Sequence, residues 1–282
     1  NYQIIIHKFN YDQQWTNFYM LESMKINISC VIATHNRDEY LKEAIYSVIN
    51  QTFLPLEIIV SNNVPNKKTQ TIIETISKKT SISIIYFEHR MKGRGSASVN
   101  LASFKTKGDY IAFLDDDDMW EKSYLEKMSI LISEKKSKII YSWISKIQNN
   151  KKTHHKKLKE NLPMKDFILT NPGCGVSNLV VDRKLFIGLG GFDDYINPSY
   201  DKDFLLRALY YDYTYDVLKE NLVVQRKHAH EQLSDINEDT LIGMKKFFKK
   251  HEWVVGPSMK IRFWIKYWKN LIKMLEFNKI KS

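Results

Sequence analysis

The chain has 282 residues, of which 43% are hydrophobic and 27% charged, a composition that excludes a disordered or collagen-like protein and suits one large domain with an appendage. Its 43 Lys and Arg against 32 Asp and Glu give a net charge of +11, which taken alone suits a nucleic-acid-binding protein. The positive charge is concentrated in two segments. Residues 241–282 hold eleven basic residues and two Glu, and residues 134–160 hold nine basic residues and two Glu. The remainder is net acidic, so two basic segments adjoin an acidic-to-neutral body.

The first residues of the chain do not fit a targeting segment. Residues 1–23 have neither a basic start nor a small-residue cleavage site, so we expect an extension of unknown role and a domain that begins at Met24. No stretch reaches the roughly 18 apolar residues of a membrane span. Cys30 and Cys174 lie far apart in the sequence, and we expect both to be free thiols in a reducing cytoplasm.

Short apolar runs alternate with amphipathic segments from residue 26 onward. The patterns predict strands at 26–33, 56–60, 82–87 and 110–114, and helices at 38–51, 69–78, 96–105 and 121–133. Continuous apolar strands separated by helices are typical of an α/β fold, with a mostly parallel central sheet covered by helices on both faces.

The pattern is weaker after residue 143. Residues 148–159 read as a polar, basic loop and 188–191 as a turn, whereas 201–211 predict a helix. Residues 177–181 are apolar, and 217–226 predict one or two further strands.

Four consecutive carboxylates, Asp115 to Asp118, directly follow the strand predicted at 110–114. Ligands of open α/β sheets bind beyond the carboxyl ends of the strands. Adjacent carboxylates repel one another, and a divalent cation such as Mg²⁺ or Mn²⁺ relieves that repulsion. The sequence therefore predicts a metal site here. The alternative is a solvated acidic turn, with Asp118 as the N-cap of the helix at 121–133.

Five segments, taken together, resemble the family 2 inverting glycosyltransferases, whose fold is called GT-A. The segments are VIATHNR at 31–37, residues 47–63, GRGSASVNLA at 93–102, KGDYIAFLDDDDMW at 107–120, and GGFDD at 190–194 followed by YDKDFLLRAL at 200–209. The match covers about residues 26–234. It implies a Rossmann-like GT-A domain at 24–235, with a nucleotide-sugar-binding half at 24–120 and an acceptor half at 121–235.

The resemblance assigns roles to the acidic run. Asp115 and Asp117 match the outer positions of the family's DxD motif, which implies that both hold Mn²⁺ or Mg²⁺ and that Asp117 is the direct ligand. Asp115 and Asp116 are then expected on the donor, with Asp116 at its ribose or sugar. His228 lies where the family often places a metal-side histidine, and the alternative is an exposed histidine at the end of a strand.

The resemblance also implies a general base for the acceptor hydroxyl. Asp201 matches the Asp of the family's Glu-Asp pair, while Tyr200 replaces the Glu. Asp203 is the second candidate base. Asp193 and Asp194 are assigned to an acceptor-side loop. The structural alternative for Asp201 is an N-cap of the helix at 202–211, a role compatible with catalysis.

The donor pocket departs from the family pattern. Two aspartates commonly follow the second strand of family members, and Asn62 and Asn63 stand there in this sequence. An amide both donates and accepts, so Asn62 could read a uracil edge or a different base. Thr34, His35 and Arg37 are predicted to line the same pocket.

One or both of two arginines are predicted to contact the donor phosphates. Arg37 follows the first predicted strand, and Arg94 lies in a glycine-containing loop before a predicted helix, whose amino end favours anions.

Residues 236–282 read as a basic, helical tail. Apolar residues of 259–277 recur at intervals of three and four, with Lys and Arg on another face and several aromatic residues. This pattern favours contact of residues 257–282 with an anionic membrane surface. The alternative is a helix that packs on the domain or on a second copy in a homodimer.

The sequence as a whole predicts an inverting, metal-dependent glycosyltransferase. The expected donor is a nucleotide-diphosphate sugar, most simply a UDP-sugar. The expected acceptor is a hydroxyl of a glycan or lipid-linked glycan in bacterial surface-polysaccharide synthesis, at the cytoplasmic face of the inner membrane. One alternative is a catalytically silent nucleotide-sugar-binding module, and another is a nucleic-acid-binding protein. The second is disfavoured because the expected cleft is acidic and the basic residues are confined to two segments. We therefore expect no nucleic-acid partner.

Overall fold

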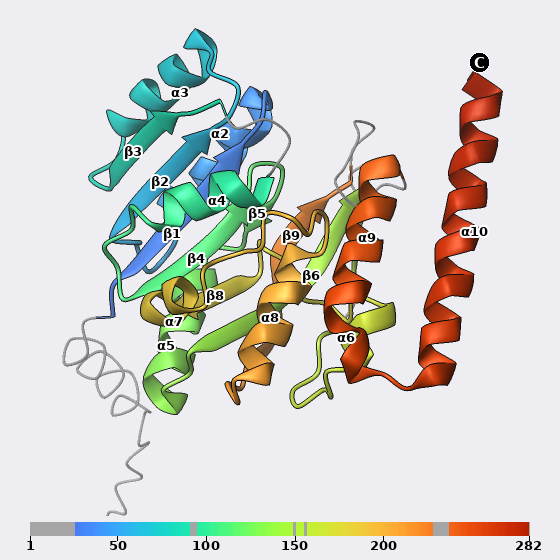
Figure 1. Ribbon diagram of the computed structural model, residues 1–282. Helices are drawn as coiled ribbons and strands as arrows, with labels where there is room; N and C mark the ends of the chain where they lie inside the picture. The colour runs from blue at the N-terminus through green and yellow to red at the C-terminus, as the bar shows by residue number, and fades with distance from the viewer. Residues whose placement is uncertain (1–25, 91–94, 149–150, 155–156, 228–236, 282) are drawn as a thin grey trace, which may run out of the picture.

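The computed structural model describes residues 26–90, 95–148, 151–154, 157–227 and 237–281 (Figure 1). The predicted extension at 1–23 and two predicted site residues, Arg94 and His228, lie outside these ranges. Within the ranges, no helix combines the length and the hydropathy that crossing a bilayer requires.

The first half of the sheet is parallel, as the apolar strand patterns predicted (Figure 1). Its strands are β1 (Ile28–Thr34), β2 (Glu57–Asn62), β3 (Ser83–Glu88) and β4 (Tyr110–Asp115). β1 lies between β2 and β4, and β3 pairs with the other edge of β2. The connecting helices are α2 (Asp38–Ile49), α3 (Lys67–Ser77) and α4 (Gly95–Ser103).

The second half of the sheet is mixed. Beyond β4 the order continues with β8 (Leu179–Asp182), β6 (Ile139–Gln148), β9 (Asp216–Arg226) and β5 (Met119–Trp120). β8 is antiparallel to both β4 and β6, whereas β9 is parallel to β6.

A short strand, β7 (Lys151–His154), pairs antiparallel with β6. The prediction of a loop through residues 148–159 was therefore wrong for this segment. Lysines are tolerated on an edge strand because one side of the strand faces water, so β7 lacks the apolar pattern by which a strand is recognised.

The remaining helices belong to the second half of the chain. They are α5 (Tyr124–Lys135), α6 (Asp166–Leu169), α7 (Arg183–Gly188), α8 (Tyr200–Tyr210), α9 (Glu238–His251) and α10 (Pro257–Lys281), with a short 3-10 helix at Glu252–Val254. α9 packs on the domain, and α10 runs outside it at the edge of the molecule (Figure 1). The rings of Phe248 on α9 and Phe263 on α10 stack with their centroids 3.7 Å apart.

Buried side chains form one core on each face of the sheet. Successive strand residues point to opposite faces, so Val31 joins one core and Ile32 the other. The first core lies under α4, α7, α8 and α9, and the second under α2, α3 and α5. The predicted α/β class with helices on both faces is confirmed. Cys30 and Cys174 are buried free thiols.

Candidate active site

The carboxyl ends of three adjacent strands bring the predicted donor residues together. Register pairs Thr34 at the end of β1 with Asn62 at the end of β2, and Ala33 with Asp115 at the end of β4. Because these strands are parallel, the segments that follow them leave the sheet at the same edge.

Asp116 is the centre of this edge. It is buried and accepts hydrogen bonds from Thr34 Oγ1 at 2.7 Å, from the His35 backbone N–H at 3.2 Å and from Arg37 Nη1 at 3.1 Å. Burial raises the pKa of Asp116, and the positive charge of Arg37 opposes that rise. Three of the predicted donor-site residues are therefore joined through one carboxylate.

Arg37 also links Asp116 to Asp117. Its Nη1 lies 2.9 Å from Asp117 Oδ2, and both ion pairs are shielded from solvent, with Arg37 27% and Asp117 12% exposed. Desolvation would lower the pKa of Arg37, but the charges of Asp116 and Asp117 outweigh it and raise the pKa. The guanidinium therefore neutralises part of the acidic run from the β1 side.

Asp118 points away from that edge. It is buried, and it accepts hydrogen bonds from Ser177 Oγ at 2.6 Å and from the Arg226 backbone N–H at 3.1 Å. Burial raises its pKa well above the usual range, with Asp115 and Asp117 adding to the rise. The alternative role as an N-cap was wrong, because α5 begins at Tyr124 and Ser123 occupies the cap position.

Asp115 lies between these two groups. Its backbone N–H donates to Ser177 Oγ at 3.1 Å, and its Oδ2 lies 3.1 Å from the same hydroxyl. Burial, then the charges of Asp117 and Asp116, raise the pKa of Asp115 to about 7. A positive charge placed beside this carboxylate would stabilise its ionised form.

The acidic run suits a cation that shares its ligands with a substrate. Asp115 and Asp117 offer hard carboxylate oxygens although each also has a protein contact, Ser177 and Arg37 respectively, whereas Asp116 and Asp118 are each held by two or more protein donors. Among the residues placed by the structure, no three His, Cys, Asp or Glu side chains are arranged to hold a metal ion. This donor set fits Mg²⁺ or Mn²⁺ held by one or two carboxylates and by phosphate oxygens, and does not fit an all-protein cage.

Asn62 at the end of β2 and Asn63 after it have different contacts. Asn62 is buried, donates to the Tyr86 hydroxyl at 3.0 Å and accepts from the Val64 backbone N–H at 3.0 Å. Asn63 Oδ1 lies 2.7 Å from His35 Nδ1 in an exposed contact. Asn62 therefore shapes the turn after β2, and Asn63 and His35 form the more accessible polar pair.

Asp201, the predicted base, lies in the first turn of α8. Helix α8 begins at Tyr200 with Ser199 in the cap position, so Asp201 is not the N-cap. Its Oδ1 accepts the Lys202 backbone N–H at 2.7 Å. Burial raises the pKa of Asp201, and the charge of Lys202 opposes the rise.

Tyr200, which directly precedes Asp201, is a buried residue of the first turn of α8. It is buried against the Phe192 ring, at 5.1 Å between centroids. Burial raises the pKa of its hydroxyl well above the usual range, and the charges of Asp115, Asp201 and Asp117 raise it further.

Asp203, the second candidate base, is unsuited to that task. It is fully buried and pairs with Arg207, Lys250 and His251, each at 2.8 Å. Burial alone would raise its pKa, but the His251 hydrogen bond, the Arg207 charge and the Lys250 hydrogen bond outweigh burial and lower the pKa to about 2. A carboxylate held this tightly is a poor proton acceptor.

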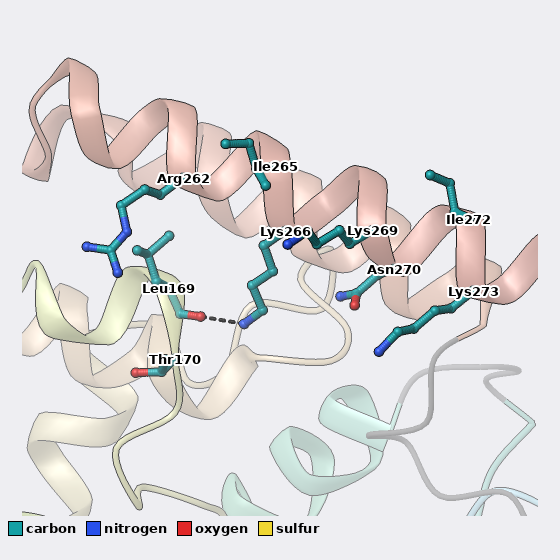
Figure 2. Close-up of a pocket in the computed structure, with 9 residues that line it drawn as sticks. All are labelled: Leu169, Thr170, Arg262, Ile265, Lys266, Lys269, Asn270, Ile272 and Lys273. Carbon is teal, nitrogen blue, oxygen red and sulfur yellow. Dashed lines mark hydrogen bonds between the residues drawn. The ribbon is translucent and has the colours of Figure 1, made fainter.

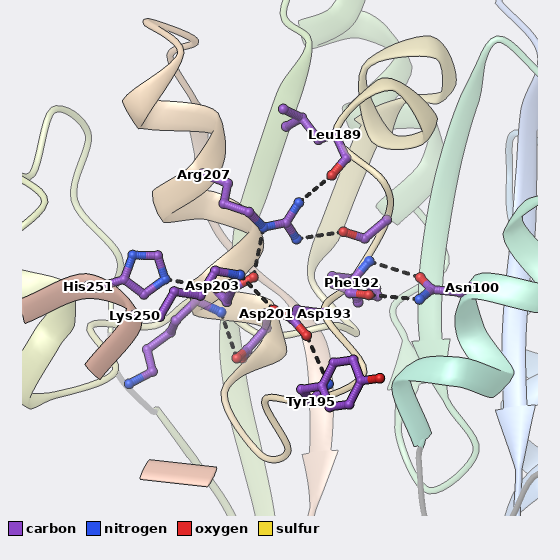
Figure 3. Close-up of polar contacts among 12 residues, drawn as sticks. Asn100, Leu189, Phe192, Asp193, Tyr195, Asp201, Asp203, Arg207, Lys250 and His251 are labelled. Atoms are coloured by element: carbon purple, nitrogen blue, oxygen red, sulfur yellow. Dashed lines mark hydrogen bonds and ion pairs between the residues drawn. The ribbon is translucent and has the colours of Figure 1, made fainter. Parts of the chain in front are cut away.

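Asn100 on α4 holds the predicted acceptor-side loop. Its amide donates to the Phe192 carbonyl at 2.8 Å, and its carbonyl accepts the Phe192 N–H at 2.9 Å (Figure 3). The amide also donates to Asp194 at 3.1 Å. Gly191 has φ +69°, and a Cβ there would lie 2.5 Å from Asn100 Oδ1. Only glycine therefore fits this close approach without displacing Asn100.

Neither composition nor periodicity singled out Ser177, Lys250 or His251, and Asp203 was predicted only as a second candidate base, not as the centre of an ion-pair cluster. Ser177 follows a glycine-containing segment and lies 59 residues from Asp118. Asp203 and His251 are 48 residues apart. The only local signal was the Asp203–Arg207 spacing of four residues on a predicted helix.

Known proteins resemble this chain in both sequence and structure. A 33% identical relative, an uncharacterized glycosyltransferase of Methanocaldococcus jannaschii, aligns over 71% of this chain and 70% of its own length. A Campylobacter jejuni protein named GalNAc(5)-diNAcBac-PP-undecaprenol beta-1,3-glucosyltransferase is 31% identical over 32% of this chain and 29% of its own length.

Two solved structures share the fold. One is S. aureus TarS 1–349 in complex with UDP-GlcNAc, which matches with a TM-score of 0.64 and 20% identity and covers 80% of this chain. This chain spans 66% of that TarS fragment, and it spans 39% of a longer TarS chain that also matches. The other is the mannosyltransferase PcManGT from Pyrobaculum calidifontis in complex with GDP-Man and Mn²⁺, with a TM-score of 0.61, 12% identity and coverage of 87% of this chain and 72% of that chain.

The family model named Glycosyl transferase family 2 matches residues 29–186, which include β1, the acidic run and Ser177. Together with the relatives and the GT-A architecture, this match establishes that the chain belongs to glycosyl transferase family 2 and is a glycosyltransferase.

Proposed function

We propose that this glycosyltransferase moves a sugar from a UDP-sugar to an acceptor hydroxyl with inversion at the anomeric carbon. The observation that carries the proposal is the cluster at the carboxyl ends of β1 and β4, where Asp115 lies beside Ala33 and Arg37 bridges Asp116 and Asp117. One side of this site then receives the donor diphosphate, and Asp201 faces the acceptor.

Asp201 is proposed as the general base. The acceptor oxygen attacks the anomeric carbon from the face opposite the diphosphate, and Asp201 takes the hydroxyl proton as the new C–O bond forms. The bond from the anomeric carbon to the phosphate oxygen breaks, and the nucleoside diphosphate departs with its electron pair. A single displacement of this kind inverts the configuration. The raised pKa of Asp201 makes it a stronger base than an exposed aspartate.

Asp115 and Asp117 are proposed to hold Mn²⁺ or Mg²⁺ together with the donor phosphates. A bound divalent ion would stabilise the negative charge of the leaving diphosphate. Arg37 contacts Asp116 and Asp117 and stands on the same side, so it is proposed to add positive charge near the phosphates. Thr34, His35 and Asp116 form the hydrogen-bonded base of the donor pocket, in which Asn62 supports the wall. The proposed contacts of Arg94 with the donor phosphates and of His228 with the metal ion remain predictions from the sequence.

The donor class can be tested by a thermal-shift screen of UDP-, GDP-, dTDP- and CMP-sugars with and without Mn²⁺. A ligand that binds only the folded state raises the melting temperature by mass action. We expect UDP-GlcNAc or UDP-glucose with Mn²⁺ to give the largest rise. A larger rise in melting temperature with a GDP-sugar would show that the nucleotide pocket prefers guanine to uracil. A rise in melting temperature without slow release of the nucleotide would support a catalytically silent binding module.

The acceptor is proposed to be a glycan or lipid-linked glycan of a bacterial surface polysaccharide. The name of the Campylobacter jejuni relative, which includes PP-undecaprenol, supports a lipid-linked acceptor. Such an acceptor would remain in a membrane, so the enzyme needs a surface that brings its active site there.

Helix α10 offers that surface. Five apolar residues at alternating intervals of four and three form an exposed stripe, each with half or more of its surface in solvent: Ile261, Ile265, Trp268, Ile272 and Leu275. Trp264 follows the same spacing of three and four, but it lies with Phe263 and Tyr267 on the inner side of α10. The helix therefore packs by one face and leaves a second apolar face exposed.

The cations beside the apolar stripe indicate which kind of surface the stripe contacts. Arg262, Lys266, Lys269 and Lys273 are exposed along α10, and Lys266 also donates to the Leu169 carbonyl across a groove of about 690 Å³ (Figure 2). An anionic bilayer complements both features, because the apolar residues enter it and the cations remain at its surface.

Replacing Trp268 and Ile272 together by Ser is expected to lower binding to vesicles of phosphatidylcholine with phosphatidylglycerol at least tenfold, because two apolar side chains no longer leave water. Vesicle co-sedimentation measures the change. Leu54→Ser is the matched control, since Leu54 is 49% exposed and far from α10 in the sequence. Unchanged binding of the double variant, or of a chain without residues 257–282, would contradict the proposal.

A further inference from the structure

Asp203 ties α8 to a helix from the carboxyl-terminal part of the chain. It lies two residues after Asp201, and its buried carboxylate pairs with Lys250 and His251 of α9 at 2.8 Å each (Figure 3). A buried carboxylate needs such partners, because an uncompensated charge is costly in a protein interior. The first turn of α8 is therefore fixed to the last turn of α9.

Lys250 also reaches the segment that precedes α8. Its Nζ lies 2.7 Å from Asp193 Oδ2 and 2.8 Å from Asp203 Oδ1. The other oxygen of Asp193 accepts the Tyr195 backbone N–H at 2.8 Å, which shapes the turn that follows. One ammonium group therefore joins the acceptor-side loop, residues 191–199, to α8.

A second contact of α9 with this loop is independent of charge. A Cβ on Gly243 would lie 2.0 Å from the Asn197 carbonyl oxygen and 2.9 Å from the Pro198 nitrogen. Backbone therefore packs directly on backbone at this point. Gly243 and Lys250 are seven residues apart, which places them on the same face of α9.

Phe247 fills the space between these two contacts. It is buried, and Lys202 Nζ lies 4.3 Å from the centre of its ring. Lys202 directly follows Asp201, so the residue after the candidate base also rests on α9. The opposite end of the loop is held by Arg207 of α8, which donates to the carbonyls of Leu189 at 2.5 Å and Gly191 at 2.6 Å (Figure 3).

We propose that the inner face of α9 positions the acceptor-side loop and the candidate base, with Lys250, Asp203 and Gly243 as positioning residues that touch neither substrate. The proposal rests on the proposed role of Asp201. It concerns residues beyond 186, where the family match ends. Misplacement of a reacting group by about 1 Å can cost about a hundredfold in rate, so a loosened α9 contact should lower turnover without lowering donor affinity.

Lys250→Met tests the charge bridge, because Met keeps an unbranched side chain and removes the ammonium group. We expect hydrogen–deuterium exchange of peptides within 191–203 to accelerate at least about tenfold, while peptides of β1 and β4 are unchanged. For release of UDP from UDP-GlcNAc with Mn²⁺, we expect kcat to fall about tenfold or more and KM to stay the same. Lys250→Arg should restore most of both properties.

Two matched controls separate positioning from general damage. Lys249→Met removes a neighbouring exposed lysine that contacts Glu252 at 3.4 Å, and should change neither exchange nor kcat. Gly243→Ala should behave like Lys250→Met, whereas Gly256→Ala should be neutral because nothing lies within 4 Å of its Cβ position.

The outcomes also separate this proposal from the proposed function. Unchanged exchange within 191–203 in Lys250→Met would overturn the positioning role whatever the activity. Faster exchange with unchanged kcat would overturn its link to catalysis. Full turnover of Asp201→Asn would instead refute the assignment of Asp201 as the base. The positioning role of α9 would then be tested by the hydrogen–deuterium exchange of residues 191–203 alone.

Discussion

Asp201→Asn is expected to lower turnover about 10²- to 10⁴-fold while leaving the affinity for UDP-GlcNAc unchanged, because the amide cannot accept the acceptor proton. Asn keeps the size of the side chain and its contact with the Lys202 backbone N–H, so the first turn of α8 should remain folded. UDP release measures turnover, and calorimetric titration measures affinity. Asp212→Asn, at an exposed site near the end of the same helix, is the matched control and should be neutral.

The pH profile gives a second readout of the same variant. The base must be ionised, and burial raises the pKa of Asp201. Turnover of the wild type should therefore fall as pH decreases through that raised pKa, above the usual aspartate range near 3.8. Asp201→Asn should lose this acid limb from its residual activity. An identical acid limb in the variant would assign the titrating group to another residue.

Asp203→Ala is expected to lower the free energy of unfolding by about 3–5 kcal/mol, because Arg207, Lys250 and His251 lose the carboxylate that they share. Urea unfolding at neutral pH measures the loss. Glu39→Ala removes the exposed Glu39–Lys68 pair, at 3.2 Å, and should cost at most about 1 kcal/mol. Equal effects of the two variants would show that the Asp203 cluster contributes no more than a surface pair.

Acid should remove the Asp203 contribution in the wild type. The pKa of Asp203 is lowered from 3.8 to about 2 in the folded chain, so the folded state favours the ionised carboxylate. The resulting stabilisation, about 2 kcal/mol, is complete above the unfolded pKa and disappears as pH falls from about 4 to about 2. In Asp203→Asn this part of the pH dependence should be absent. A parallel loss of stability in both proteins would contradict the assignment.

The sequence was sufficient to predict the parallel half of the fold and the polar residues that meet at the carboxyl ends of its strands. Strands such as residues 110–114 are buried on both faces, so they are continuously apolar and easily recognised. The polar residues that follow such strands lie at one edge of the sheet by geometry. The family resemblance predicted Thr34, Arg37 and Asp116 for one pocket, and the structure joins the three by hydrogen bonds at this edge.

The remaining features depend on contacts that no local pattern encodes. Asp118 turns inward because Ser177, distant in sequence, offers its hydroxyl. Asp203 is the centre of a polar cluster because α9 brings Lys250 and His251 to it. Helix α10 has apolar residues on two faces, so its periodicity could not decide which face packs on α9.

The central claim is that the carboxylates after β4 hold a nucleotide diphosphate through a divalent cation. The measurement that tests it most directly is the melting temperature with UDP and Mn²⁺, with UDP and EDTA, and in Asp117→Asn. We predict a rise for the wild type with Mn²⁺, corresponding to about 2.7 kcal/mol at a UDP concentration of about 100 Kd. The rise should vanish with EDTA and in Asp117→Asn, and should persist in Glu39→Gln. An equal rise in EDTA, or in Asp117→Asn with Mn²⁺, would contradict the claim.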